Sequence, residues 1–354
     1  MAKKKRIDLR HAKSGMVLAA PVLSENGRVI INEDVALTEA MLQNLATWQI
    51  PAISIWDEEE LPRQFSATHF ADEYDNTVQL VDSAFASMRF CGELPLAEMQ
   101  QNVVGSVLQM TETIGAMHHL HAMRRLGEYT IHHSVGVSVI CGVLGKWLGY
   151  EGTALRDLVL AGLLHDIGKT QIPEELIAKP EKLTDEEMAQ MKQHSALAIE
   201  LLRKTETATM DVVLAILQHH ERMDGSGYPN KLRGDQIHPY ARILAVADLY
   251  DAVTNDRPFQ PKISPFSAAR LIAGDMYDKL DTATSATFLE HLRDQFTGCQ
   301  VQLSDGRMAE VILIGSDYTF HPVVKTQDGK FVDIGRNPKL KIAQLAVPDS
   351  PQQA

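Results

Sequence analysis

The chain has 354 residues, of which 45% are hydrophobic and 23% are charged, so it is long enough to form two or three globular domains. Its formal net charge of -12 argues against a protein that binds DNA or RNA broadly, because such proteins present a basic face to phosphates. The three cysteines lie far apart without a CxxC pair, which excludes a disulfide framework and a zinc ribbon and favours the cytoplasm.

Residues 3–6 are basic, but no apolar run follows them as in a signal peptide, so we expect a solvated terminus. No stretch approaches the length of about 20 apolar residues that a membrane-spanning helix needs. We therefore expect no membrane span.

Residues 1–56 are predicted to form a small α+β module, because short apolar runs alternate there with turn signals. The pair Asn26-Gly27 favours a tight hairpin turn, whose central residues need positive φ. Thr38 is a predicted N-cap of a short helix, and the letters AISIW then predict a strand.

Residues 57–127 are predicted to be a linker followed by a helical connector. The acidic run at the start of this segment and the letters LPRQFS interrupt the pattern of the first module. Helical periodicity then takes over and includes His118, His119 and His121. We expect these three histidines to be solvated or to lie between helices, because adjacent helical positions cannot all face one point.

Residues 128–295 are predicted to be an all-helical domain and residues 296–347 a short β-rich segment. The latter contains the strand patterns AEVILIG and HPVVKT, with two Asp-Gly pairs as turn signals. The predicted fold class is therefore mainly α, with a small α+β module before the helical domain and a β-rich segment after it.

Seven potential metal ligands lie in the helical domain, most of them beside apolar helical sequence. They are His133, His165, Asp166, His194, His219, His220 and Asp248. Imidazole nitrogen together with carboxylate oxygen suits Fe, Mn, Zn or Ni, and the set exceeds what one tetrahedral ion takes. A two-metal site with one bridging aspartate fits better and is suited to in-line displacement at phosphorus, with the ions about 3.5–4 Å apart. A single buried histidine is more often a core residue, so composition alone leaves packing open as an alternative.

The letters LLHDIGK place a histidine and an aspartate directly after an apolar run. A buried, ionised Asp166 requires a cation or a dense set of hydrogen-bond donors. Lys169 shares the face of this pair if the helix continues, or lies on a following turn if Gly168 ends the helix. In either case a cation lies beside the predicted metals, where it could stabilise charge on a phosphoryl oxygen.

The order of these motifs resembles the HD-GYP family of HD-superfamily phosphohydrolases. The matching letters are HDIGK at 165–169, HHERMDGSGYP at 219–229 and AVADLYDAVTNDRPF at 245–259, with Lys-Pro, Leu-Thr and Glu-Glu pairs within 179–187. The resemblance covers about residues 128–295. In addition, the letters LRHAKSGMVLAAPV resemble the start of a small domain that often precedes HD-GYP domains.

The resemblance implies an HD-type fold and a hydrolase that opens cyclic di-GMP to pGpG, with many members continuing to GMP. It implies two divalent transition-metal ions, Fe or Mn, and in-line attack by a hydroxide that bridges them. The implied metal ligands are His133, His165, Asp166, His194, His219, His220 and Asp248, with Asp166 bridging. The implied catalytic residues are Asp166 and Lys169. The implied substrate-binding residues are Lys169, Gly227, Tyr228, Pro229 and Arg257.

Two positions depart from the family pattern. Members with three metals carry a glutamate four residues before the first ligand histidine, where this chain has Tyr129, so we expect two metals. Some members carry a lysine where this chain has Gln260, a change that bears on substrate affinity more than on chemistry.

The resemblance also implies partners and leaves rival functions open. Tyr228 would form a wall of the substrate cleft or a docking point for diguanylate cyclase (GGDEF) domains, or else a stabilising corner of its loop. A homodimer is a candidate assembly. The implied setting is bacterial second-messenger signalling in biofilm formation and motility. The rivals are a cyclic di-GMP receptor that scarcely turns over and a phosphohydrolase of another nucleotide.

Overall fold

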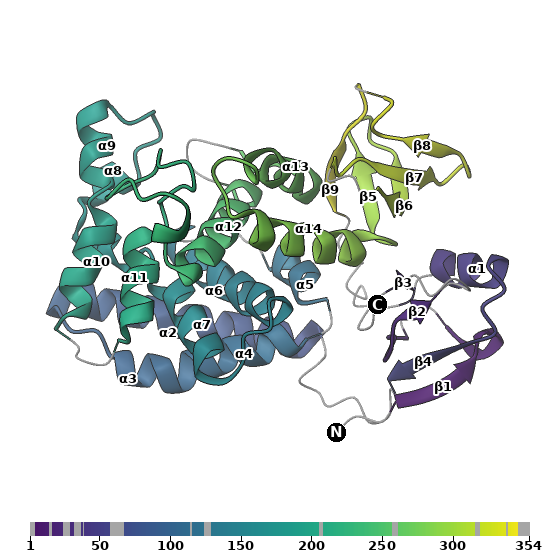
Figure 1. Cartoon of the computed structure of the whole chain (residues 1–354), viewed down its shortest axis with the longest axis horizontal. Coiled ribbons are helices and arrows are strands. Elements are labelled where there is room, and N and C mark those ends of the chain that lie inside the picture. Colours follow the sequence, from purple (N-terminus) through teal and green to yellow (C-terminus); the bar gives the residue numbers. More distant parts are fainter. Residues whose placement is uncertain are drawn as a thin grey trace, which may run out of the picture. The chain divides into compact units, whose positions relative to one another are not determined.

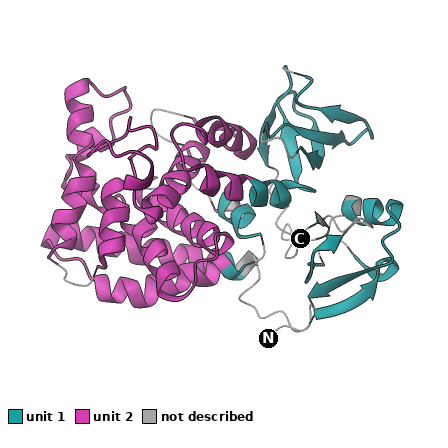
Figure 2. Cartoon of the chain, in the orientation of Figure 1, with its two compact units in different colours: residues 1–70, 112–122, 290–354 teal, residues 71–111, 123–289 magenta. Residues whose placement is uncertain are grey.

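The computed structural model describes residues 4–13, 16–23, 29–31, 37, 39–56, 67–113, 115–123, 129–204, 208–256, 261–315, 319–337 and 339–345. The chain divides into two compact units (Figure 2). Unit 1 comprises residues 1–70, 112–122 and 290–354, and unit 2 comprises residues 71–111 and 123–289. The boundaries of the four predicted domains stay a prediction.

The N-terminal part of unit 1 is the expected α+β module. Strand β1 (Lys4–Asp8) pairs antiparallel with β4 (Ala52–Trp56), β2 (Val22–Leu23) pairs with β3 (Val29–Ile31), and helix α1 (Glu39–Thr47) lies between β3 and β4 in the chain. The predicted strand AISIW and the predicted hairpin are therefore present, whereas Thr38 and the turn Asn26-Gly27 lie outside the described residues. The basic residues 4–6 are exposed as expected, but they form a strand.

The C-terminal part of unit 1 is a five-stranded antiparallel sheet with strand order β8-β7-β6-β5-β9. The strands are β5 (Gln300–Leu303), β6 (Met308–Ile314), β7 (Pro322–Thr326), β8 (Phe331–Asp333) and β9 (Ile342–Leu345). The two Asp-Gly pairs stand between paired strands, and Gly306 and Gly329 adopt φ of +88° and +81°, which favour glycine. Helix α5 (Ala116–Ala122), which carries the three predicted bystander histidines, also belongs to unit 1.

Unit 2 is helical (Figure 1). The helices that lie wholly or mostly in it are α2 (Ala67–Cys91), α3 (Leu96–Glu98), the π-helical turn η4 (Met99–Val103), α4 (Val104–Glu112), α6 (Tyr129–Trp147), α7 (Gly152–Leu164), the 3-10 helix η5 (Ile167–Gln171), α8 (Glu174–Ile177), α9 (Asp185–Met191), α10 (His194–Leu202), α11 (Met210–Gln218), the 3-10 helix η6 (Gly234–Gln236), α12 (Pro239–Thr254), α13 (Pro265–Asp275) and α14 (Thr282–Phe296). The predicted fold class, mainly α with flanking α+β and β-rich parts, is confirmed.

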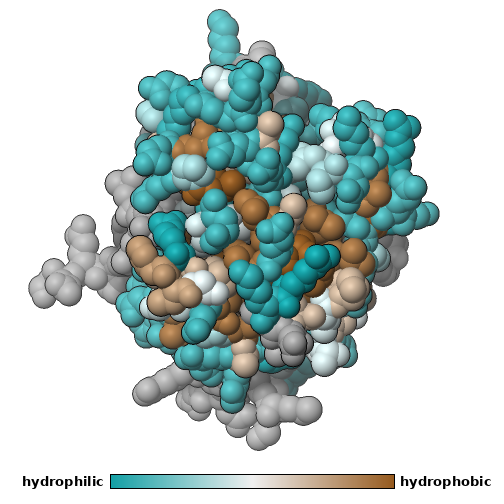
Figure 3. All heavy atoms as spheres, turned by 90° about the vertical axis from the view of Figure 1, so that its left-hand side faces the viewer, coloured by the Kyte–Doolittle hydropathy of each residue, from teal (hydrophilic) through white to brown (hydrophobic). Residues whose placement is uncertain are grey.

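The core of unit 2 is built around α6, α7, α11 and α12, which pack against one another. Helices α6 and α7 are apolar around most of their circumference, as expected of helices buried in a larger domain. Figure 3 shows one face of the molecule, where hydrophilic residues predominate and hydrophobic ones gather in patches. None of the described helices combines the length and the apolar character that crossing a bilayer requires.

Candidate metal centre

Helix α7 delivers His165 and Asp166 into the interior of unit 2. Every residue from Leu158 to Leu164 is buried, the helix ends at Leu164, and His165 and Asp166 are 0% and 1% exposed. Lys169 does not continue this helix but lies on η5, so the second of the two predicted alternatives is the observed one. Its Nζ donates to Asp166 Oδ2 at 2.6 Å, which gives the buried carboxylate one cationic partner.

The seven predicted ligands converge from α6, α7, α10, α11 and α12. Two groups form: His133, His165 and Asp166 in one, and His194, His219 and His220 in the other. Within each group the three donor atoms lie within 4.8 Å of one another. Each group thus offers three ligands, the number that metal sites with an open coordination position commonly use.

The two aspartates Asp166 and Asp248 connect the groups. Asp166 Oδ2 lies 3.4 Å from His165 Nε2, and its Oδ1 lies 3.6 Å from His194 Nε2 in the other group. Asp248, on α12, repeats this pattern, with Oδ1 3.1 Å from His133 Nε2 and Oδ2 3.9 Å from His220 Nδ1. Each carboxylate therefore turns one oxygen toward each group, which is the placement that a bridging ligand needs.

Three of the histidines are oriented by the carbonyl of their own preceding turn. His165, His194 and His219 each direct Nδ1 at the carbonyl oxygen three residues earlier, at distances of 2.7, 2.7 and 2.6 Å. Because a carbonyl only accepts, Nδ1 carries the proton and Nε2 carries a lone pair.

These lone pairs face other acceptors. His194 Nε2 lies 3.4 Å from His219 Nε2, and His165 Nε2 faces the Asp166 carboxylate. Acceptors directed at one another at this distance repel unless a cation lies between them, so the donor set fits divalent metal ions.

Electrostatics in the site favour the ligand forms of most of these groups. Burial lowers the pKa of His219 to about 3, and it lowers the pKa of His194 and His220 as well. Burial alone would raise the pKa of Asp166, but its polar surroundings, chiefly the charge of Lys169, outweigh this effect and hold the pKa well below the usual range. The carboxylates are therefore ionised and the three histidines of the second group are neutral, as metal ligands must be.

His133 differs because it lies between two carboxylates. Burial acts to lower its pKa, but hydrogen bonds to Asp248 and Asp251 outweigh this effect and raise the pKa to about 9. Asp251 Oδ2 lies 2.8 Å from His133 Nδ1 and also accepts a hydrogen bond from Asn255 Nδ2 at 2.6 Å. Asp251 was not among the residues predicted from the sequence. Its only signal was a spacing of three residues from Asp248, which places both on one face of α12.

We predict that Asp251→Asn weakens metal binding by about 10- to 100-fold, the usual cost of losing the carboxylate behind a ligand histidine. The substitution removes the negative charge that supports His133. Titration of the protein with metal in the presence of a competing chelator measures the change. Asp278→Asn, at an exposed position, is the matched control and should bind metal as the parent does. Equal affinities in the two variants would contradict the assigned role.

The loop that contains Gly227, Tyr228 and Pro229 lies against the second group. Glu221, which is 2% exposed, accepts the backbone N–H groups of Asn230 and Leu232 at 2.7 and 3.0 Å and so anchors the loop. The Tyr228 ring lies against the His220 ring, with centroids 4.6 Å apart. The loop thus forms one rim of the candidate metal centre.

Gly227 lies close against the backbone of its own loop. A Cβ there would lie 2.5 Å from Arg222 N, Glu221 Cα and His220 O. We predict that Gly227→Ala lowers the free energy of unfolding by about 1–3 kcal/mol, the usual cost of overpacking. Thermal denaturation measures the loss. The control Gly274→Ala has open space around the added methyl group and lies within a helix, so it should be neutral or slightly stabilising. If Gly227→Ala were as stable as this control, the loop would accommodate the added methyl group and the prediction would be wrong.

The remaining residues singled out in the sequence lie outside the site or outside the described part of the chain. Arg257 and Gln260 lie outside the described residues, as does the side chain of Tyr129. Of the three histidines expected to be solvated or to lie between helices, His119 lies beside Phe70 with ring centroids 5.6 Å apart.

The chain is similar in sequence to known proteins that contain an HD domain. A sequence profile of the HD domain matches residues 108–283. The chain is 33% identical over 234 residues to the cyclic di-GMP phosphodiesterase PA4108 of Pseudomonas aeruginosa, covering 66% of this chain and 53% of that protein. It is 42% identical over 125 residues to the cyclic di-GMP phosphodiesterase response regulator RpfG of Xanthomonas campestris pv. campestris, covering 35% of this chain and 33% of that protein.

Two further likenesses bear on substrate and fold. The chain is 39% identical over 137 residues to the 3'3'-cGAMP-specific phosphodiesterase 1 of Vibrio cholerae, covering 39% of this chain and 32% of that protein. It therefore spans about half or less of the length of these curated relatives. The solved structure of Bd1817, an HDG"Y"P protein from Bdellovibrio bacteriovorus, is similar with a TM-score of 0.53 and 18% identity, over 82% of this chain and 99% of that chain. At that identity the likeness shows the fold alone.

Proposed function

Because this chain belongs to the HD-domain family and to the HD-GYP group within it, we propose that it is a metal-dependent phosphodiesterase that hydrolyses cyclic di-GMP to pGpG. The observation that carries the proposal is the pair of three-donor groups connected by two aspartates. A site of this kind suits displacement at phosphorus more than it suits a purely structural metal, because each group leaves coordination positions open.

Two divalent ions, iron or manganese, are the proposed cofactors. His133, His165 and Asp248 would hold one, and His194, His219 and His220 the other, with Asp166 shared between them. Bound ions would supply water that ionises near neutral pH and would neutralise negative charge on the phosphodiester. The histidine orientation by backbone carbonyls would hold the ligands in place before substrate arrives.

Lys169 is the residue proposed to contact substrate phosphate. Its side chain is 21% exposed, whereas that of Asp166 is 2% exposed, so Nζ stands between the buried carboxylate and the open side of the site. From there an ammonium group can stabilise charge that develops on a phosphoryl oxygen. Arg257 is proposed as a second contact, on the family resemblance alone.

The rim formed by the loop of Gly227, Tyr228 and Pro229 is the proposed wall of the substrate cleft. Tyr228 presents its ring beside His220, and Lys192 Nζ lies 5.1 Å from the centroid of that ring. A nucleotide base can pack on such a surface. The same loop is the proposed docking point for diguanylate cyclase domains, in a cytoplasmic signalling role in biofilm formation and motility. A homodimer is the proposed assembly.

The test is metal analysis and nucleotide product profiling on one anaerobically purified sample. We expect close to two iron or manganese ions per chain and conversion of cyclic di-GMP to pGpG. Because one relative is specific for 3'3'-cGAMP, that dinucleotide is the parallel substrate. If only 3'3'-cGAMP were hydrolysed, the proposed phosphodiesterase reaction would stand and cyclic di-GMP would be wrong as its substrate. Binding of cyclic di-GMP without hydrolysis at any metal would favour the receptor, and intact substrate without binding would refute the proposal.

A further inference from the structure

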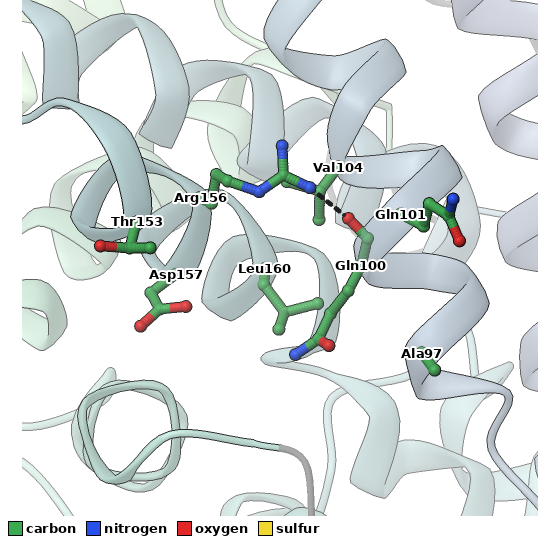
Figure 4. Close-up of a pocket in the computed structure, with 8 residues that line it drawn as sticks. All are labelled: Ala97, Gln100, Gln101, Val104, Thr153, Arg156, Asp157 and Leu160. Atoms are coloured by element: carbon green, nitrogen blue, oxygen red, sulfur yellow. Dashed lines mark hydrogen bonds between the residues drawn. The ribbon is translucent and has the colours of Figure 1, made fainter.

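A pocket of unit 2 lies between the N-terminal half of α7 and the segment α3–η4–α4 (Figure 4). Its volume is about 390 Å³, within the range of about 300–1,000 Å³ that small-molecule sites occupy. None of the seven proposed metal ligands lines it. The side chains of Thr153, Arg156, Asp157 and Leu160 form the α7 wall, and Gln101 and Val104 belong to the facing wall.

Arg156 supplies a positive charge that the described part of the chain leaves without an ion pair. The guanidinium reaches from α7 toward η4, where Nη2 donates to the carbonyl oxygen of Gln100 at 2.6 Å. This bond holds the planar group in position. Nη1 makes no hydrogen bond to a described residue, so the group retains donors for an oxyanion such as a phosphate.

Asp157 supplies an acceptor at the other side of the pocket. Its Oδ2 accepts a hydrogen bond from Thr209 Oγ1 at 2.9 Å, and its Oδ1 has no hydrogen-bond donor among the described residues. Figure 4 shows the Arg156 and Asp157 side chains diverging, with Leu160 between the walls. Leu160 and Val104 line the pocket between these two polar side chains and give it an apolar floor.

A complementary ligand therefore has an anionic group at one end, N–H donors at the other and a flat apolar face between them. Inorganic phosphate would satisfy Arg156 but leave the apolar floor and Asp157 unused. We propose that this pocket binds a purine nucleoside monophosphate, with the phosphate on Arg156 and base N–H groups on Asp157. The choice of GMP as its ligand rests on the proposed function, because pGpG consists of two GMP units.

The position of the pocket gives such a ligand a connection to the metal centre. Thr209, which bonds Asp157, is also the N-cap of α11, where its side chain accepts from Val212 N. Helices α7 and α11 end at the caps His165 and His219. The pocket is therefore lined by the beginning of α7 and connected through the Asp157–Thr209 hydrogen bond to the beginning of α11, and the ends of both helices carry proposed metal ligands.

Hydrogen exchange measured by mass spectrometry on the metal-loaded full chain tests this site, with GMP, ribose 5-phosphate and inorganic phosphate as probes. We expect GMP to slow exchange in peptides covering 97–104 and 153–160, and the two smaller probes to leave them unchanged. Arg156→Gln should weaken GMP binding by about 10- to 100-fold, the loss expected for charge-assisted hydrogen bonds. Arg156→Lys keeps the positive charge but lacks the planar, two-pronged guanidinium, so its affinity for GMP should lie between that of the parent protein and that of Arg156→Gln. Arg203→Gln, at an exposed position, is the control.

Each outcome decides between the alternatives. Equal slowing by inorganic phosphate would reduce the pocket to an oxyanion site and overturn the nucleotide proposal. Absence of slowing by GMP, or slowing that survives Arg156→Gln, would overturn the site itself. Lys169→Met should retain the slowing, because Lys169 does not line this pocket. GMP binding here in a protein that leaves cyclic di-GMP intact would uphold this site and refute the proposed function, and hydrolysis without such binding would do the reverse.

Discussion

Asp166→Asn is expected to reduce hydrolysis of cyclic di-GMP by more than about 10³-fold, beyond what removal of one hydrogen-bond donor at a reacting oxygen usually costs. Asp166 directs one oxygen at each histidine group, and an amide offers an acceptor to only one of them while presenting N–H donors to the other. The substitution also removes the negative charge that draws cations into a buried site. We therefore expect the metal content to fall from two ions per chain to one or none.

Metal content by mass spectrometry and turnover by chromatography of the nucleotides measure both effects of Asp166→Asn. Asp278→Asn, which makes the same chemical change at an exposed position, should retain the metals and the rate. Circular dichroism verifies that the helical fold is intact in both variants. Full activity with two bound metals in Asp166→Asn would remove Asp166 from the proposed site.

Lys169→Met is expected to lower kcat by about 10²- to 10³-fold while leaving the metal content close to that of the parent. Methionine approximates the length and volume of the lysine stem but has no charge to offer a phosphoryl oxygen. It also removes the 2.6 Å bond to Asp166 Oδ2, although that carboxylate would keep its contacts to the metals. Retained metal combined with lost turnover would distinguish a substrate contact from a merely structural ion pair.

Steady-state kinetics and metal analysis on the same preparations measure the effect of Lys169→Met. Lys182→Met, at an exposed position outside the site, should change neither. If Lys169→Met loses its metals together with its activity, Lys169 acts by positioning Asp166. If kcat and KM both stay at parental values, Lys169 has no part in the reaction.

The proposed ligand residues could be selected from the sequence because most of them lie at one end of an apolar helical run. His165 and His219 are the caps of α7 and α11, and buried helices lead side chains at their ends into the interior. Asp251 was not predictable in the same way. It lies within a helix that has several polar residues, and its role depends on the packing of α12 against α6, which brings it to His133. The pocket at Arg156 depends in the same way on helices that are distant in sequence.

Strand β1 shows a similar limit at the N-terminus. Lys4, Lys5 and Arg6 have exposed side chains and the composition of a solvated terminus. The backbone nevertheless pairs with β4, whose alternating buried residues Ile53 and Ile55 face the core of the module. Pairing of this kind is determined by a partner about fifty residues away in the chain, and local composition carries little information about it.

The carbonyl contacts of His165, His194 and His219 have a consequence for the assembly of the site. Each imidazole takes its orientation from its own turn of backbone, so each ligand is preset within a short segment. No disulfide cross-links these segments. Bound metal ions would act as cross-links between chain segments as far apart as residues 133 and 248, closing long loops as disulfides do in proteins that have them. Because the three cysteines of this chain are unpaired, the metal ions proposed for the reaction would also stabilise the fold.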